Sequence, residues 1–384
     1  MTSTAFRSPL ALVLSGGGAR AAYQVGVLHA IAESLPPATP LPFPIVCGNS
    51  AGALNAAFIA ADARYFDRAV RGLDQLWTAL EPAAIYRTEG RVLMLAALRM
   101  VRAFFRGYPD GAAITPALLD SSPLGALLER VVDFTGIGRN IADGLVQALA
   151  ITAFSYSSGR SVSFCQTTPD CPMWARAQRR GIADTITARH LLASTAIPFI
   201  FPAVRIGDEY YGDGSMRQIA PTSPALHLGA ARIFVIGVTR SSAEQRGATE
   251  PGQIPTLAAI GGQMLANIFT DGMSSDLEKV RLVNAAVRQI PEEARLRSPV
   301  PLRDVDLFSI NPSVSLEAIA RCHIDCLPRP LRRALGGNSA AVGNGAGMAS
   351  YLLFHSDFCR ELIELGRRDA RARMDEISAF LAPR

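Results

Sequence analysis

Short apolar runs rich in β-branched residues alternate along this chain with stretches of helical periodicity. The runs are Leu10–Leu14, Ile45–Cys47, Leu149–Phe154, Ile233–Val238 and Val305–Ile310. The helical stretches between them include Ala21–Ser34, Ala51–Ala61, Asp67–Leu80 and Leu124–Phe134. Apolar runs of this length are typical of strands that are buried on both faces of a parallel sheet. The alternation therefore predicts a layered α/β fold with a mostly parallel central sheet.

We expect one large domain over residues 9–310 and a mostly helical C-terminal extension over residues 311–384, packed on that domain. The extension should end in a mixed-charge amphipathic helix near Phe358–Leu381, with a solvated face. Residues 85–120 interrupt the domain as an arginine-rich helical insertion. As a helix, Arg91–Arg106 would carry its arginines on one face and apolar side chains elsewhere. That pattern fits either a lid packed on the domain or a helix that docks on a lipid surface.

Composition excludes several classes of protein. Hydrophobic residues make up 49% of the chain and charged residues 18%, which excludes intrinsic disorder. No apolar run approaches the ~20 residues needed to span a membrane. The first run, Leu10–Leu14, is also too short for the core of a signal peptide. The sequence therefore predicts a cytoplasmic protein, and it leaves open a peripheral attachment to membranes.

Charge and cysteine content narrow the choice of partners. The net charge of +5 is mild and its arginines are not interleaved with aromatic residues, so we expect no nucleic-acid binding. Cys322-His323-x-x-Cys326 is half of a metal site by its spacing. No second cluster with ligand spacing follows in the sequence, so we expect no metal and no cofactor. The oligomeric state is left open.

The first segment with chemical character is Ser15-Gly16-Gly17-Gly18-Ala19-Arg20, which joins the first expected strand to a helix. Three successive glycines let backbone N–H groups converge at the positive end of the following helix. Such a loop binds an anion, which is either a phosphate or an oxyanion that forms during a reaction.

The second segment is Gly48-Asn49-Ser50-Ala51-Gly52, directly after the expected strand Ile45–Cys47. This is a G-x-S-x-G sequence on a strand-to-helix turn, where the small flanking residues permit the sharp bend of a nucleophile elbow. The elbow would present Ser50 Oγ above the sheet and place the N–H of Ala51 beside the oxygen of an attacked ester.

A nucleophilic serine needs a base, and the sequence offers two kinds. In Tyr210-Tyr211-Gly212-Asp213-Gly214-Ser215 an aspartate lies between glycines, which by itself is typical of a turn. A triad in the order serine, acid, histidine would instead use His323 or His355. His355 lies in a stretch that we interpret as helical, and neither histidine lies in a clear strand-end loop.

Together these segments resemble the patatin-like phospholipase family, whose pattern is a G-G-G-x-R loop, a G-x-S-x-G elbow and a D-G-G/A element. The order matches, and so does the proline-bearing block Ala193–Pro202 between the elbow and the aspartate. The resemblance covers roughly residues 9–225. Ser15, Ala21 and Ser215 depart from the residues usual in the family, although all three are small.

The resemblance implies a three-layer patatin-type fold and a serine acyl-ester hydrolase of phospholipase A or lysophospholipase type, without a cofactor. It implies a dyad in which Ser50 is the nucleophile and Asp213 the base. Gly16, Gly17, Gly18 and Ala51 would form the oxyanion hole, with Arg20, Gly48, Gly52 and Gly214 in supporting positions. The expected partner is a lipid at a membrane or micelle surface, with no nucleic acid.

Two other functions fit parts of the sequence. Gly16–Ala21 also matches the G-x-G-x-x-A fingerprint of dinucleotide-binding sites. That fingerprint needs an acidic residue at the end of the next strand, and here the strand leads to Asn49 and Ser50 instead. A non-catalytic acyl-binding protein with the same fold is the second alternative.

Overall fold

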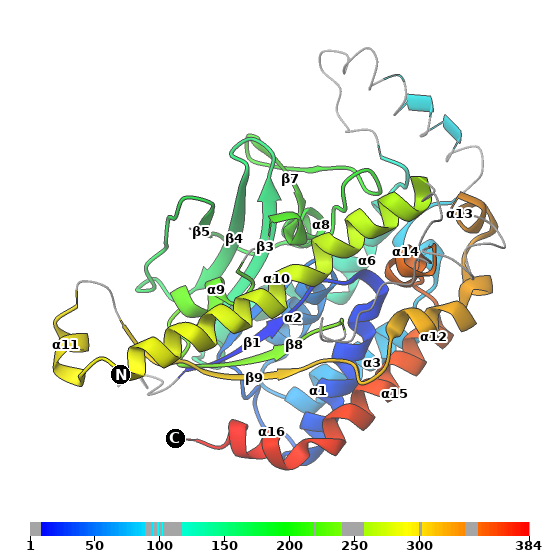
Figure 1. Cartoon of the computed structure of the whole chain (residues 1–384). Coiled ribbons are helices and arrows are strands. Elements are labelled where there is room, and N and C mark those ends of the chain that lie inside the picture. Colours follow the sequence, from blue (N-terminus) through cyan, green and yellow to red (C-terminus); the bar gives the residue numbers. More distant parts are fainter. Residues whose placement is uncertain are drawn as a thin grey trace, which may run out of the picture.

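Figure 1 shows a computed structural model of the chain, which describes residues 9–88, 94–95, 98–99, 102, 117–217, 220–239, 257–298, 302–334 and 345–383. In these residues nine strands form one sheet, whose main path runs β5-β4-β3-β2-β1-β8-β9. The strands are β1 (Leu10–Leu14), β2 (Ile45–Asn49), β3 (Ala148–Ser155), β4 (Arg160–Thr167), β5 (Arg179–Ala183), β6 (Val204–Ile206), β7 (Glu209–Asp213), β8 (Arg232–Ile236) and β9 (Asp306–Ile310).

The centre of the sheet is parallel, as the sequence predicted. Strand β1 pairs in parallel with β2 and β8, β2 with β3, and β8 with β9. All five expected strands are therefore present, side by side. Strands β4 to β7, which lie toward one edge of the sheet, were not predicted from the sequence. There β4 and β7 pair with β3 in antiparallel fashion, and polar residues in β4 interrupt its apolar pattern.

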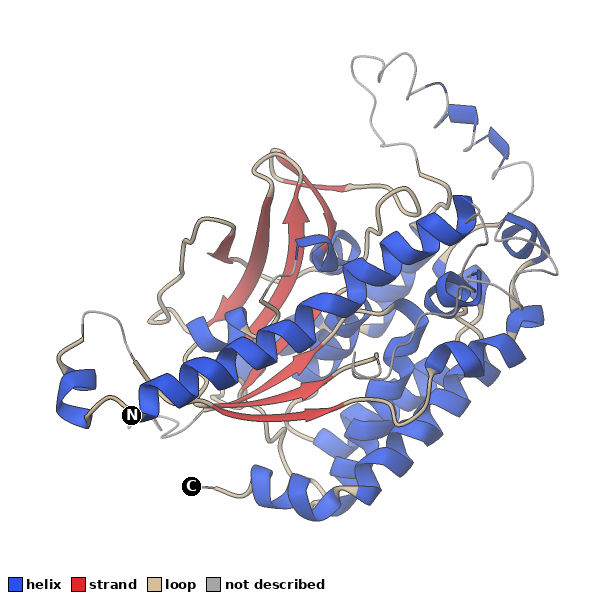
Figure 2. Cartoon of the chain, viewed as in Figure 1, coloured by secondary structure: helices blue, strands red, loops and turns tan. Residues whose placement is uncertain are grey.

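Helices cover both faces of the sheet (Figure 2). In β1 alternate residues enter different cores, with Leu12 in one and Val13 in the other. The first core is covered by α1 (Ala22–Ser34), α2 (Ala51–Ala61), α3 (Phe66–Thr78) and α15 (Ser356–Ala372). The second is covered by α9 (Ser223–His227) and by the long α10 (Leu257–Arg288), which crosses the front of the sheet in Figure 1. This is the three-layer α/β architecture.

The remaining helices lie mostly around the first core and at the carboxyl end of the sheet. They are α4 (Pro82–Ile85), α6 (Ser122–Val131), α7 (Phe134–Ala142), α8 (Ala188–Ser194), α11 (Glu292–Leu296), α12 (Leu316–Cys322), α13 (Arg329–Ala334), α14 (Gly345–Leu352) and α16 (Met374–Leu381). Short 3-10 helices span Gly18–Ala21 (η1), Gly214–Arg217 (η2) and Ile324–Cys326 (η4). None of the helices in the described ranges is both long enough and apolar enough to cross a bilayer.

Three details of the expected helices were wrong. The helix expected over Leu124–Phe134 ends at Val131, and α7 begins at Phe134 because Asp133 caps it by accepting the N–H of Gly136. The helix expected over Phe358–Leu381 is two helices, which are separated at Arg373. His355 is not helical, because it is the extended N-cap residue of α15.

The expected insertion lies largely outside the described residues. Arg91 and Arg106 are among those not described, so the arginine stripe cannot be followed across Arg91–Arg106. Helical geometry is described at 94–95, 98–99 and 102, where Met94 and Leu98 are about two-thirds exposed (67% and 66%). At the borders of the insertion, Tyr86 and Leu119 are buried and belong to the main core.

The C-terminal extension shares the core of the main domain. Helix α15 lies along α1, and Phe358 and Leu362 are buried in the first core. A Cβ atom on Gly26 of α1 would lie 1.9 Å from the carbonyl oxygen of Ile363, which shows how closely the two helix backbones approach. We keep residue 310, where β9 ends, as the proposed boundary between the domain and its extension.

We predict that Gly26→Ala destabilises the fold. The added methyl group must push α15 away from α1. We expect this to lower the free energy of unfolding by about 3 kcal/mol, which is near the upper end of the destabilisation usual for overpacked cores. Gly125→Ala in α6 is the matched control, because its Cβ would meet only a movable side-chain carbon of Leu192 at 3.3 Å. Urea unfolding of both variants measures the difference, and equal stability would show that α15 is not held on α1.

Candidate active site

Ser50 lies on the sharp turn between β2 and α2. Its φ of 51° and ψ of −132° are strained for a residue with a side chain. The turn is held in place by Ser194, whose Oγ accepts the N–H of Ser50 at 2.8 Å and donates to the carbonyl of Thr152 at 2.6 Å. A Cβ atom on Gly48 or Gly52 would lie within 2.5 Å of a backbone oxygen, so the bend admits only glycine at both positions.

The structure brings Ser50 and Asp213 together. The Oγ of Ser50 donates to Oδ2 of Asp213 at 2.7 Å, although the two residues are 163 positions apart. Asp213 is the last residue of β7, which pairs with β3 so that Asp213 is opposite Ala153. Its N–H also donates to the carbonyl of Ala196 at 2.9 Å, within the proline-bearing block. Gly214 follows, where a Cβ atom would lie 2.1 Å from the carbonyl oxygen of Thr152.

Burial changes the acidity of Asp213. The side chain is fully buried, and this burial raises its pKa to about 6, despite the hydrogen bonds from Ser215 and Ser50 that favour the charged form. The other carboxylate oxygen, Oδ1, accepts the backbone N–H of Ser215 at 2.8 Å. A carboxylate with a raised pKa is a stronger base than an exposed one, and at neutral pH it is still mostly ionised.

Asn49 links the base to the glycine loop, a role that the sequence analysis did not anticipate. Its Oδ1 accepts the N–H of Gly16 at 3.1 Å, and its Nδ2 donates to Oγ of Ser215 at 2.7 Å. The N–H of Gly16 is therefore already used within the protein. In contrast, the N–H groups of Gly17, Gly18 and Ala51 have no hydrogen-bond partner in the described part of the chain.

Arg20 anchors the glycine loop to the C-terminal extension. The side chain is buried, its Nε donates to Oγ of Ser350 at 2.8 Å, and its guanidinium lies 3.1 Å from Oε1 of Glu317 and 4.0 Å from the ring centre of Tyr351. Gly18 has a φ of +54°, and a Cβ there would lie 2.1 Å from the carbonyl oxygen of Tyr351. Helix α14 therefore packs directly on the loop.

An apolar pocket opens beside Ser50. Gly18, Ser50 and Ala51 form one end of it. The rest of the lining is almost entirely apolar and comes from Leu54, Trp77, Leu80, Ile85, Leu124, Leu128, Leu191, Thr195, Ile197, Phe201 and Phe354. Trp77 stacks on Phe354 and donates its Nε1–H to Asn55, so this wall joins α3 to the extension. The pocket can take a hydrocarbon chain.

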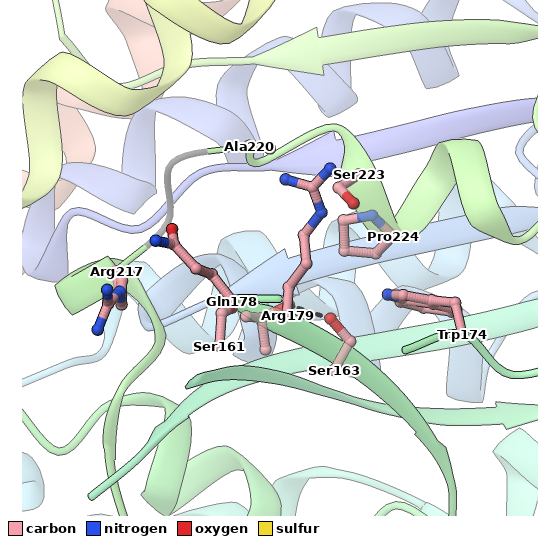
Figure 3. A pocket seen from close by; sticks show the side chains of 10 residues that line it. Ser161, Ser163, Trp174, Gln178, Arg179, Arg217, Ala220, Ser223 and Pro224 are labelled. Atoms are coloured by element: carbon pink, nitrogen blue, oxygen red, sulfur yellow. Dashed lines mark hydrogen bonds between the residues drawn. The ribbon is translucent and has the colours of Figure 1, made fainter. Parts of the chain in front are cut away.

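A second pocket, lined largely by polar residues, lies on the other face of the sheet (Figure 3). Figure 3 shows the Arg179 side chain reaching up past Gln178 toward Ser223, while Arg217 lies to one side. Ser161 and Ser163 of β4 are also among its lining residues, but neither Ser50 nor Asp213 is. This pocket is therefore separate from the serine site.

The five histidines have partners away from Ser50. His323 pairs with Glu361 at 2.7 Å, and His355 lies 3.8 Å from both Glu81 and Asp357. His190 belongs to the capping box of α8, His29 pairs with Glu33, and His227 bonds to Ser223. None of them contacts Ser50 or Asp213 in the residues that the structure describes.

Comparison with known proteins adds independent information. A family model described as Patatin-like phospholipase matches residues 12–226. Among solved structures, human GIVD cytosolic phospholipase A2 in complex with methyl gamma-linolenyl fluorophosphonate is similar, with 12% identity and a TM-score of 0.41. That match covers 97% of this chain and 59% of the human chain, so the present chain spans less than two thirds of it. VipD from Legionella pneumophila has 15% identity and a TM-score of 0.30, with 93% of this chain and 67% of VipD covered. No curated protein sequence matches.

We predict that Asp213→Asn stabilises the fold at alkaline pH. The pKa of Asp213 rises from 3.8 unfolded to about 6 folded, so stability is lost as pH rises between these values and stays lost above them. The shift corresponds to about 3 kcal/mol, which the uncharged amide should recover. Urea unfolding at pH 8 should give a higher free energy of unfolding for Asp213→Asn than for the wild type. This difference should become smaller as the pH is lowered toward 4. Asp208→Asn, at an exposed position in the same hairpin, is the control. A variant no more stable than the wild type at pH 8 would contradict the burial argument.

Proposed function

The chain belongs to the patatin-like phospholipase family, a family of lipid acyl hydrolases, and on that basis we propose that it cleaves acyl esters of phospholipids or related lipids by a Ser50–Asp213 dyad. The observation that carries this proposal is the 2.7 Å hydrogen bond from Ser50 Oγ to Asp213 Oδ2 at the end of an apolar pocket. Family membership also removes the reason to interpret the glycine loop as a dinucleotide site.

In the first step Ser50 Oγ attacks the ester carbonyl while its proton passes to Asp213 Oδ2. The hydrogen bond already points this proton at the base, and the strained turn exposes Oγ toward the pocket. Asp213 suits this role because burial raises its pKa to about 6. The alcohol or lysolipid then leaves with the proton from Asp213, and an acyl group remains on Ser50.

The negative oxygen of the intermediate needs hydrogen-bond donors that are fixed before the reaction. The N–H groups of Gly17, Gly18 and Ala51 are suitable because they are unpaired in the described residues, and Gly18 and Ala51 line the pocket beside Ser50. We assign the oxyanion hole to these three and give Gly16 a structural part, since its N–H is bonded to Asn49. The loss of one such donor typically raises the barrier by about 3 kcal/mol.

Water completes the cycle. Asp213 takes a proton from the water that attacks the acyl group, the fatty acid leaves, and the proton returns to Ser50. The apolar pocket holds the acyl chain during both steps, since its lining excludes water and offers hydrocarbon surface.

We predict that Ser50→Ala abolishes the turnover of p-nitrophenyl butyrate in a protein that remains folded by circular dichroism.

Asp213→Asn should lower kcat by at least about 10²-fold, the usual scale for the loss of a general base. His323→Ala and His355→Ala, assayed with chelator present, should each keep most of the activity. If a histidine variant is inactive while Asp213→Asn is active, a triad replaces the dyad. A wild-type protein that binds acyl chains without turnover would favour the non-catalytic alternative.

The pocket must also meet a lipid surface, and Phe199 is placed to make that contact. Its side chain is 74% exposed, in a loop whose neighbours Ile197 and Phe201 line the pocket. A φ of 65° is strained for phenylalanine, so the surrounding loop holds this orientation, in part through the bond from Leu118 N–H to the Phe199 carbonyl. We propose that Phe199 inserts into the lipid surface when the pocket faces it.

We predict that Phe199→Glu weakens binding to phospholipid vesicles by tenfold or more, as expected when about 1.5–3 kcal/mol of apolar burial is lost. Leu282→Glu, at a position that is 71% exposed on α10, should leave binding unchanged. Co-sedimentation with vesicles measures binding, and turnover of a water-soluble ester checks that the site is intact. Equal binding by both variants would remove Phe199 from the docking surface and leave the esterase proposal untouched.

A further inference from the structure

Three side chains with metal-ligand chemistry meet at the surface beside the apolar pocket. Cys326 ends η4, His355 is the N-cap residue of α15, and Asp357 lies in the first turn of α15. Their ligand atoms all lie within 4.8 Å of one another. None of the three takes part in the dyad or the oxyanion hole.

The histidine is in the form that can bind a metal. Nδ1 of His355 accepts the N–H of Asp357 at 3.3 Å, so Nδ1 is unprotonated and the proton of a neutral ring is on Nε2; a metal would take the Nδ1 lone pair by displacing this long hydrogen bond. Nε2 faces Oε2 of Glu81 at 3.8 Å. A carboxylate on the far nitrogen is the arrangement that orients metal-binding histidines in many proteins.

The three ligand atoms need only small movements to reach the spacing of a zinc site. In a tetrahedral zinc site with bonds of about 2.0–2.3 Å, neighbouring ligand atoms lie about 3.3–3.6 Å apart. His355 Nδ1 and Asp357 Oδ2 are 3.8 Å apart. The sulfur of Cys326, which is half-buried, lies within 4.8 Å of the other two ligand atoms, and a side-chain rotation can bring it closer.

The local charge favours a cation. The carboxylates of Asp357, Asp325 and Glu81 lie near the Cys326 thiol and create a negative potential there. The same negative potential attracts a divalent ion, which in turn stabilises the thiolate. In contrast, His323 is bonded to Glu361 at 2.7 Å, and the exposed Cys322 is not part of the cluster.

We propose that Cys326, His355 and Asp357 bind one zinc-type divalent cation, with water as the fourth ligand and Glu81 as the outer carboxylate. On binding, the S–H bond of Cys326 breaks, its proton goes to solvent, and a sulfur–metal bond forms. The thiolate and the carboxylate together neutralise the charge of the ion, and no electron is transferred.

The site would join the extension to the wall of the acyl pocket. His355 directly follows Phe354 and Glu81 directly follows Leu80, and both of these apolar residues line the pocket. A bound ion would also tie η4 to the start of α15. Its effect is therefore to stabilise this corner of the fold, independently of the chemistry at Ser50.

Cobalt(II) is the probe, because its bond to a thiolate gives an absorption band in the near ultraviolet that water-bound cobalt lacks. Titration of the reduced wild-type protein should give this band with one equivalent of cobalt bound, and zinc should abolish it by displacement. Cys326→Ser should lose the band, and His355→Gln and Asp357→Asn should each weaken binding at least tenfold. Glu81→Gln should weaken binding by about tenfold, as for other outer-shell partners.

Cys322→Ser is the matched control, since it removes a neighbouring thiol outside the cluster and should leave the band and the affinity unchanged. Circular dichroism of each variant without metal shows whether it is folded, and zinc should raise the Tm of the wild type and of Cys322→Ser but not of Cys326→Ser. Absence of the thiolate band in the folded wild type, its survival in Cys326→Ser, or its loss in Cys322→Ser would each overturn the proposal.

Discussion

The hydrogen bond between Ser50 and Asp213 is the interaction around which the carboxyl end of the sheet is organised. Both side chains are buried, and the hydrogen bonds that Ser50 and Ser215 donate to Asp213 favour its ionised form against the cost of burial. The surrounding structure holds both partners through the backbone, with Ser194 on the turn of Ser50 and Ala196 on the N–H of Asp213. A strained serine and a buried carboxylate therefore persist because the surrounding backbone fixes their positions.

The other end of the chain completes this site. Arg20 follows the glycine loop and is buried against Ser350, Glu317 and Tyr351 of the extension. Phe354 then forms a wall of the acyl pocket. The loop would lose this packing without α14, so the extension helps to hold the glycine loop in place. The proposed metal site would stabilise the same part of the structure, because its ligand His355 directly follows Phe354.

Much of the fold and of the site could be predicted from local patterns. The central strands, α2 and the elbow at Ser50 follow from apolar runs and from small residues at fixed spacing, which act within a few residues of one another. Strands β4 to β7 were missed because polar residues interrupt their apolar pattern, although β4 forms a hairpin with β3 and β7 forms one with β6. His355 was misjudged as helical because the apolar residues before it suggest a helix that in fact ends at Leu352.

The sequence by itself determined which residues have the right chemistry: a serine on a glycine-flanked turn, a glycine loop after a strand, and an aspartate between glycines. Only the tertiary structure decided which of them meet. It pairs Asp213 rather than a histidine with Ser50, commits Gly16 to Asn49, and brings His355 and Asp357 to Cys326. The physical reason is that a turn depends on the residues beside it, whereas a hydrogen bond between distant residues depends on how strands pair and helices pack.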